Sequence, residues 1–269
     1  MRLRSTVAIP AGSPIDAALE SEADAILVTL ADAGHNVEDL RAAAQYALPR
    51  IREAGKLAAV MVNHPRTQLL RGDLEAVVTP DLGTVFLPHT VEPQDMRDLA
   101  VALREFEYNR DIEPGSVRVF AVIDNARGLL RAAEIVQSVP RVAGLMFAGR
   151  LYAEDTGARH EEAGPRLSYA RGAVVAAARG HAALPLVESS GLELVNLAEH
   201  GFAGAVISDP RFAAGANAAF TPSANLRERA QQELDAYDAA RSAGDGVARY
   251  GSGVVDGDAA RRARQTLEG

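Results

Sequence analysis

The chain has 269 residues, of which 48% are hydrophobic and 24% charged, so it can bury one large core and is too apolar for a disordered protein. Its formal net charge of −8 argues against nucleic acid or an anionic membrane as the main partner. It has no cysteine, which excludes disulfides, thiolate nucleophiles and cysteine-based zinc sites. Since no apolar stretch approaches ~18 residues and no signal-peptide pattern opens the chain, we expect a cytoplasmic protein.

Eight short apolar runs recur along the chain, and most are continuous, which is typical of parallel strands covered on both faces. They span residues 6–9, 25–29, 57–62, 83–87, 117–123, 143–147, 183–187 and 203–207. Amphipathic segments alternate with these runs, at residues 37–52, 93–107, 126–137, 169–178 and 189–200. This alternation predicts a closed (β/α)8 TIM barrel of the α/β class. An open doubly wound sheet is the alternative, although no G-x-G-x-x-G phosphate loop follows the first run.

A helical tail follows the eighth run. Thr221, followed by Pro and Ser, is the expected N-cap of its first helix. One apolar stripe then consists of Leu226, Ala230, Leu234 and Tyr237. A Gly-rich break over residues 242–253 precedes a last helix near residues 259–267. We therefore expect a barrel over residues 1–220 and a C-terminal helical extension over 221–269, which packs on its own barrel or on a neighbouring one.

Polar residues follow several of the predicted strands. In barrels of this type, function collects at the carboxyl ends of the strands. The candidates at these ends are Asp32, Asn63, His89, Asp124, Gly149 and Arg150. His89 could move a proton, because an ordinary imidazole has a pKa near neutrality, or it could be structural. Asp124 could form a bidentate pair with Arg150, or it could be a metal ligand.

Several segments resemble the citrate lyase β-subunits and malyl-CoA lyases, and they do so in order from end to end. Residues 123–128, Ile-Asp-Asn-Ala-Arg-Gly, are similar to the family's I-E-T-A-R-G, and Ala-Ala-Glu-Ile at 132–135 is similar to its A-A-E-I. The other matching segments are residues 4–10 (R-S-x-L-x-V-P in the family), 23–33 (A-D-A-x-I-x-D-L-E-D-A), 60–63 (V-R-V-N), 87–88 (the start of L-P-K), 220–223 and 255–256. The order and spacing of these segments support the barrel.

The resemblance implies a chemistry and an assembly. Members of this family use Mg²⁺ to make or break a C–C bond between an acyl-CoA enolate and a 2-oxo acid, and the metal polarises the oxo-acid carbonyl. The resemblance also implies a homotrimer or hexamer, and a carboxylate or CoA-thioester as the small-molecule partner. The residues assigned to substrate binding are Arg4, Asn63, Arg127, Gly149, Arg150 and Asp256.

The metal-binding positions depart from the family pattern. The family's metal Glu aligns with Asp124, but its metal Asp falls on Leu151 and the preceding Glu on Arg150. Asp155 lies four residues farther along, which we expect to be out of reach. The substrate-binding Arg of V-R-V-N becomes Met61. We therefore expect no metal ligands and no cofactor, although Mg²⁺ serves the family.

Three functions are compatible with this pattern. The first is a metal-independent C–C lyase or aldolase-type enzyme on a CoA-thioester or carboxylic-acid metabolite, with an arginine stabilising the developing oxyanion. Its proton-moving candidates are His89, Asp32 and Asp124, and its anion-binding candidates are Arg4, Arg127 and Arg150. The second is a non-catalytic paralogue that binds a ligand or regulates a partner. The third is a Mg²⁺-dependent lyase with relocated ligands.

Overall fold

The structure is a computed structural model that describes residues 3–31, 36–159 and 167–268. Its contacts divide the chain into two compact units, Leu3–Ala218 and a second unit built around Ala219–Gly269. Each unit is described by itself. Within the described residues, no helix is both long enough and apolar enough to cross a membrane.

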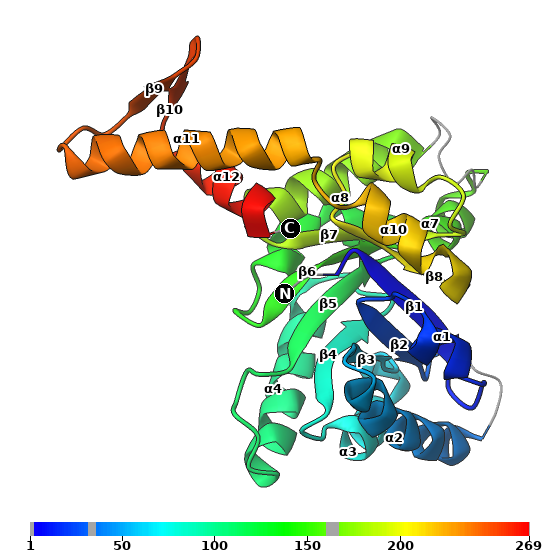
Figure 1. Ribbon diagram of the computed structural model, residues 1–269. Coiled ribbons are helices and arrows are strands. Elements are labelled where there is room, and N and C mark those ends of the chain that lie inside the picture. The colour runs from blue at the N-terminus through cyan, green and yellow to red at the C-terminus, as the bar shows by residue number, and fades with distance from the viewer. Residues whose placement is uncertain (1–2, 32–35, 160–166, 269) are drawn as a thin grey trace. The chain divides into compact units, whose positions relative to one another are not determined.

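Eight parallel strands close the first unit into a barrel, in which each strand pairs with the next and β8 pairs with β1 (Figure 1). The strands are β1 Ser5–Pro10, β2 Ala25–Thr29, β3 Leu57–Met61, β4 Leu82–Leu87, β5 Arg118–Ile123, β6 Val142–Phe147, β7 Leu184–Ser189 and β8 Gly204–Ile207. The predicted (β/α)8 barrel is confirmed, and each predicted apolar run overlaps one strand. The open-sheet alternative is wrong, because Thr6 of β1 pairs with Val206 of β8 and closes the sheet.

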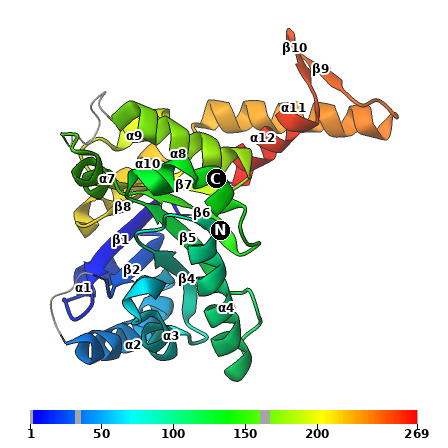
Figure 2. The same ribbon diagram turned by 180° about the vertical axis from the view of Figure 1, so that it is seen from behind.

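Helices surround the barrel, as the views from the front and from behind show (Figures 1 and 2). They are α1 Asp16–Glu20, α2 Val37–Glu53, α3 Leu70–Val77, α4 Pro93–Asn109, α5 Ala126–Leu130, α6 Ala132–Val136, α7 Gly149–Thr156, α8 Ser168–Gly180, α9 Leu194–Glu199 and α10 Ala213–Ala219, with 3-10 turns η1 Pro65–Thr67 and η3 Pro210–Phe212. Two predicted helices need correction. The segment 126–137 is two short helices interrupted at Arg131, and the segment 189–200 begins too early because Ser189 still belongs to β7.

One apolar cluster fills the interior of the barrel. Its buried members are Leu3, Ala25, Leu27, Ala59, Phe86, Phe120, Val122, Met146, Ala148, Leu186 and Val206. Phe86 and Phe120 stack with ring centroids 4.8 Å apart. Gly144 makes room for this stack, because a Cβ there would lie 2.3 Å from the Phe120 ring. The interior is therefore a packed core, and any ligand site has to lie at one of its ends.

The second unit contains helix α11 (Ala224–Ser242), a hairpin of β9 (Ala248–Tyr250) and β10 (Gly253–Val255), and helix α12 (Gly257–Glu268). Its small core consists of Tyr237, Ala248, Val255 and Ala260. The N-cap of α11 is Ser223, whose Oγ accepts a hydrogen bond from Leu226 N, so the expected Thr221 cap is wrong by two residues. The hairpin begins inside the predicted Gly-rich break and ends two residues after it.

Candidate functional site

The carboxyl ends of the strands form one end of the barrel, which we call the mouth. Side chains along each strand point alternately into and out of the barrel. A strand residue that belongs to the interior cluster therefore points inward, and so does every second residue before and after it. The mouth layer, as we call it, consists of the last inward residues of the eight strands and of the next inward positions directly after β5 and β6. The strand residues are Pro10, Thr29, Met61, Phe86, Val122, Met146, Glu188 and Val206, and the two that follow the strands are Asp124 and Ala148. Two of them are carboxylates, and none is Lys, Arg or His.

His89 and Asp124 meet at the mouth, directly after β4 and β5. Asp124 Oδ2 accepts a hydrogen bond from the backbone N of His89 at 2.8 Å and lies 3.0 Å from His89 Nδ1. The Asp124 side chain is 1% exposed and the His89 side chain 50% exposed. In the neutral imidazole, Nδ1–H donates to the carboxylate, which makes Nε2 the basic nitrogen. The pair is therefore a half-exposed imidazole oriented by a buried carboxylate.

The backbone at His89 is held in an unusual conformation. Its φ of +54° lies in the left-handed region, which is costly for a residue with a Cβ and is found mainly where the surroundings impose it. Asp124 accepts from both the His89 amide and the ring, so it fixes the turn and the imidazole together. This strained turn supports a functional assignment for the pair.

The segment after β5 explains how the pair is supported. Asn125 caps α5, because its Oδ1 accepts from Gly128 N at 2.8 Å, while its Nδ2 donates to Asp124 Oδ1 at 2.7 Å. Gly128 allows α5 to approach the His89 turn, since a Cβ there would lie 2.3 Å from Thr90 O. The residues Asp-Asn-Ala-Arg-Gly thus place the carboxylate and pack its helix against the neighbouring turn.

Asp95 supports the same turn from the other side. It is buried, and its Oδ2 accepts from Val91 N at 2.9 Å and Glu92 N at 3.1 Å. Its Oδ1 accepts from Arg66 Nη2 at 3.1 Å and lies 3.4 Å from His64 Nε2. Sequence reasoning missed Asp95, although Glu92 and Asp95 form a capping box at the start of α4 that is readable in the sequence.

His64 is a second histidine at the mouth, and it is buried. Burial is the main cause that lowers the pKa of His64 below its usual range, with nearby Arg66 and His89 acting in the same direction and Asp95 opposing them. Its Nδ1 accepts from Arg66 N at 3.2 Å, which requires that nitrogen to be unprotonated. His64 is therefore a neutral, structural histidine.

Asn63 is fixed by a buried network at the end of β3. Its backbone N and its Nδ2 both donate to Asp73 Oδ2 at 2.8 Å. Asp73 is fully buried, and its Oδ1 accepts from Arg41 Nε at 2.9 Å. Asp73 and Arg41 were not expected from the sequence, because they lie on α3 and α2 and meet Asn63 only in the folded barrel.

One predicted site residue lies away from the mouth, and two others are not placed relative to it. Arg4 precedes β1 and therefore lies at the opposite, amino end of the barrel, where its Nη2 pairs with Asp24 Oδ1 at 2.6 Å. Asp256 belongs to the second unit, where its Oδ1 accepts from Ala259 N at the start of α12. Asp32 lies outside the described residues.

Arg127, Gly149 and Arg150 lie on the turns at the mouth. Arg127 is exposed in α5, and no described residue pairs with it. Gly149 is buried and begins α7 directly after β6. Arg150 Nη1 donates to Glu154 Oε1 at 2.7 Å. The expected pair between Asp124 and Arg150 is therefore wrong, because position 150 lies in the first turn of a helix with a carboxylate one turn later.

The described donors at the aligned metal positions do not fit Mg²⁺, which is usually held by one or two carboxylates and several waters in near-octahedral geometry. Among the described residues, no group of three or more His, Asp or Glu side chains could hold a metal ion. Both Asp124 oxygens accept hydrogen bonds, and Leu151 offers no ligand atom. Asp155 does reach the loop after Asp124, contrary to expectation, but its Oδ2 is bound to Ala126 N at 2.8 Å.

Lysine chemistry is also absent from the mouth. The sequence contains a single lysine, Lys56. It precedes β3 at the amino end of the barrel, where its Nζ donates to Ser21 O at 2.5 Å and Ala23 O at 3.1 Å. Burial lowers the pKa of Lys56, and Asp24 partly opposes this shift. A Schiff base with a carbonyl substrate at the mouth therefore has no lysine to form it.

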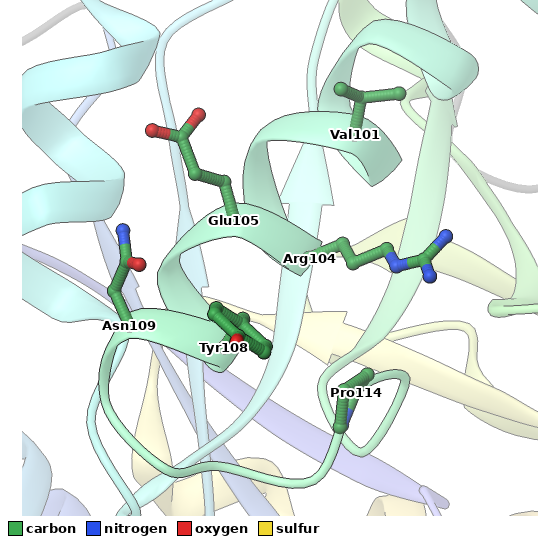
Figure 3. Close-up of a pocket in the computed structure, with 6 residues that line it drawn as sticks. All are labelled: Val101, Arg104, Glu105, Tyr108, Asn109 and Pro114. Carbon is green, nitrogen blue, oxygen red and sulfur yellow. The ribbon is translucent and has the colours of Figure 1, made fainter.

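Two surface hollows lie outside the mouth. One, of about 340 Å³, lies on the outer face of α4 and the loop that leads to the amino end of β5; its lining includes Val101, Tyr108 and Pro114 (Figure 3). Figure 3 shows Arg104 and Glu105 pointing away from the helix in different directions. The other, of about 600 Å³, lies within the second unit between α11, the hairpin and α12. Neither contains a predicted site residue.

Comparisons with known proteins agree with this fold. The chain is 29% identical over 204 residues to the citrate lyase subunit beta of Escherichia coli K12, covering 72% of this chain and 68% of that protein. It is 27% identical over 278 residues to a (3S)-malyl-CoA thioesterase of Cereibacter sphaeroides, covering 98% and 93%. The structure of CitE from Mycobacterium tuberculosis in complex with magnesium, acetoacetate and coenzyme A matches with a TM-score of 0.69 and 22% identity over 98% of this chain and 96% of that one.

The family assignment follows from the barrel and from a match over most of its length. The profile described as HpcH/HpaI aldolase/citrate lyase matches residues 10–199, which include six of the eight barrel strands, β2 to β7, in full. This chain belongs to the HpcH/HpaI aldolase/citrate lyase family.

Proposed function

We propose that the protein is a C–C lyase or aldolase-type enzyme that acts without a metal on a CoA-thioester or carboxylic-acid metabolite, with His89 and Asp124 as its acid–base pair. The observation that carries the proposal is the contact of 3.0 Å between His89 Nδ1 and the buried Asp124 carboxylate at the barrel mouth. Family membership supports the lyase class. The E. coli relative is a citrate lyase subunit and the C. sphaeroides relative is a malyl-CoA thioesterase.

In the cleavage direction, His89 Nε2 takes the proton of a β-hydroxyl group on the substrate. The C–O bond becomes a carbonyl, the Cα–Cβ bond breaks, and its electron pair forms the enolate of the acyl fragment. The imidazolium returns the proton to the enolate carbon, so that atoms and charge balance. The Asp124 carboxylate stabilises the imidazolium and keeps Nε2 toward the substrate.

Anionic parts of the substrate would be held at the turns around the mouth. Arg127 is exposed there and is not engaged by a described residue. Helix α7 begins at the mouth without a side-chain cap, so its first amides could donate hydrogen bonds to an enolate oxygen. Asn63, fixed by Asp73, completes the polar groups in this region.

A deuterium-exchange experiment tests the pair. Acetyl-CoA is incubated with the full chain in D2O containing EDTA, and the loss of α-protons is followed by mass spectrometry. We expect His89→Gln and Asp124→Asn to slow the exchange by a factor on the order of a hundred or more, since general acid–base catalysis contributes about that much. His200→Gln is the matched control, because His200 follows α9, away from the mouth. Wild-type exchange in His89→Gln would exclude His89 as the base.

A non-catalytic ligand-binding paralogue is the second candidate. The observation that supports this candidate is that both carboxylate oxygens of Asp124 already accept hydrogen bonds, one from the His89 backbone and one from Asn125. A chain that binds acetyl-CoA in a calorimeter but does not exchange its α-protons would support this candidate over the enzyme.

We also propose a cytoplasmic homo-oligomer, a trimer or hexamer, in which the C-terminal extension packs on its own or a neighbouring barrel. This proposal is supported by the resemblance to the citrate lyase β-subunits. Light scattering of the purified chain measures the mass in solution, and a monomer at all accessible concentrations would contradict it.

A further inference from the structure

The outer face of helix α4 carries a row of exposed residues, which we call the α4 stripe. Its members are Gln94, Arg97, Asp98, Val101, Arg104, Glu105 and Tyr108. Positions three, four and seven apart lie on one side of a helix, so these side chains share one face, and four of them are labelled in Figure 3. Val101 and Tyr108 are 70% and 77% exposed. The α4 stripe therefore presents two large apolar side chains to solvent, flanked by charges.

The order of the charges in the α4 stripe inverts about Val101. From Arg97 onward the segment reads Arg-Asp-Leu-Ala-Val-Ala-Leu-Arg-Glu. Counted outward from Val101, the apolar neighbours are the same in both directions, whereas the charged residues have opposite signs. Asp98 on one side corresponds to Arg104 on the other, and Arg97 corresponds to Glu105 in the same way. A two-fold axis at Val101 reverses the helix and so brings each of these residues to the level of an opposite charge.

The charged residues of the α4 stripe are only partly engaged within the chain. No described residue pairs with Arg97 or Arg104. Asp98 Oδ1 accepts a hydrogen bond at 2.7 Å from the side-chain amide of the glutamine one turn earlier, which is a neutral donor. Glu105 Oε2 accepts from Arg71 Nη1 of α3 at 2.9 Å, and both of these side chains remain well exposed. The stripe thus keeps two arginines, as far as the described residues extend, for an outside partner.

The helices beside α4 do not upset the balance of charge. Helix α4 packs against α3 and α6. The ionisable residues contributed by these flanks and by the end of α4 are Arg71 and Glu75 on α3, Glu134 on α6, and Arg110. They add two cations and two anions to the two arginines and two carboxylates of the stripe. The face therefore carries no excess of one sign, and its charges differ by position, as the contact of a face with a copy of itself requires.

We propose that the α4 stripe is a contact between two copies of this chain, related by a two-fold axis at Val101. At the axis, Val101 meets its own counterpart. On either side of the axis, each copy supplies one arginine and one carboxylate at the same level, so the charges compensate across the contact. Tyr108 lies at the level of Gln94 of the second copy, beside the hollow of about 340 Å³ on this face. The inference goes beyond the proposed function and does not depend on catalysis.

The size of the α4 stripe sets the strength of this contact. From Gln94 to Tyr108 the stripe spans about 21 Å of helix. One helix face of this length is smaller than the roughly 800 Å² per partner that a stable interface buries. The contact is therefore weak by itself and forms a dimer only at high concentration. In a chain that also forms a trimer, the same two-fold contact joins two trimers into a hexamer.

The absence of cysteine from the sequence allows a direct test. Val101→Cys places a single thiol at the proposed axis, and Tyr46→Cys on α2 is the matched control, because Tyr46 is similarly exposed, at 68%. Each full chain is oxidised with copper phenanthroline in air, and disulfide-linked dimers are quantified on non-reducing gels. We expect Val101→Cys to cross-link at least tenfold faster than Tyr46→Cys, because a residue on a two-fold axis meets its own copy. Equal rates would overturn the inference.

A charge exchange in the Val101→Cys background tests the register. Arg104→Glu leaves one arginine and three carboxylates at each level, so it is expected to slow cross-linking to the rate of the Tyr46→Cys control. Adding Asp98→Arg restores two charges of each sign and is expected to restore the rate. Arg52→Glu, the same change at an exposed arginine of α2, should leave the rate unchanged. Circular dichroism verifies that each variant is folded. A folded Arg104→Glu chain that still cross-links rapidly, or an exchange variant that stays slow, would overturn the two-fold contact.

Discussion

The carboxylates at the two ends of the barrel have different partners. At the amino end, Glu107 is fully buried, and its Oε2 pairs with Arg141 Nη2 at 2.8 Å, while Asp24 pairs with Arg4 at 2.6 Å. Both of these carboxylates have a guanidinium as a partner. Such pairs neutralise charge in place and mainly preserve the structure.

At the mouth, Asp124 is held without a guanidinium, whereas Asp95 and Asp73 accept hydrogen bonds from arginines as well as from N–H groups of amides. Asp124 accepts from the backbone and ring of His89 and from Asn125, and Asp95 accepts from the amides of Val91 and Glu92. These bonds fix the turns that carry His89, but they do not place a guanidinium against Asp124. We conclude that the paired carboxylates at the amino end mainly stabilise the fold, whereas Asp124 at the mouth is placed to act on an imidazole.

The largest effect is expected from breaking the ion pair at the amino end. Arg141→Ala would leave the buried Glu107 carboxylate without its cation, which costs about 3–5 kcal/mol of unfolding free energy. Urea denaturation measures the loss. The control is Arg150→Ala at the mouth, whose side chain is 56% exposed and, among the described residues, pairs with Glu154 alone. This variant should leave the urea midpoint nearly unchanged. Equal losses for both variants would contradict the contrast.

A smaller effect is expected where α5 packs on the His89 turn. Gly128→Ala places a Cβ 2.3 Å from Thr90 O, so the helix must shift, at a cost of about 1–3 kcal/mol. Gly172→Ala in α8 is the matched control, because nothing lies within 4 Å of its Cβ, and it should stabilise by about 0.5–1 kcal/mol. The same sign of change in both urea midpoints would show that α5 does not pack as described.

The smallest effect concerns pH and His64. Because burial lowers the pKa of His64 in the folded state, the unfolded chain binds more protons between that lowered pKa and about 6.5. The stability contributed by His64 is therefore fully present above pH ~6.5 and is lost as the pH falls below it. We expect the imidazole NMR titration of His64 to lie below that of free histidine, and His64→Gln to weaken the loss of stability from pH 7.5 to 5.5. A raised pKa would contradict the buried, neutral ring.

Much of the barrel could be predicted from the sequence, because continuous apolar runs of strand length leave few alternatives to buried parallel strands. Short helices such as α3 and α7 were missed, since eight residues carry too little periodicity. The position of Arg4 was readable, because it precedes its strand. The ion pair between Arg150 and Glu154 could also be predicted, because the two residues are four positions apart on one helix.

The pairing of His89 with Asp124 could not be derived from sequence. The two residues are 35 positions apart and become neighbours only because β4 and β5 are adjacent in the closed barrel. Each was selected separately as a strand-end residue, but the left-handed turn that joins them leaves no pattern in the sequence. For the same reason Asp73, which fixes Asn63, was not anticipated.

The most direct test of the account is the metal dependence of α-proton exchange by the wild-type chain. The protein is stripped with EDTA, and the exchange rate of acetyl-CoA in D2O is measured before and after saturating Mg²⁺ is added in excess of the chelator. We expect measurable exchange in EDTA and a rate that changes less than twofold with Mg²⁺, because the described acids at the mouth do not form a magnesium site. Exchange that is absent in EDTA and appears with Mg²⁺ would contradict it.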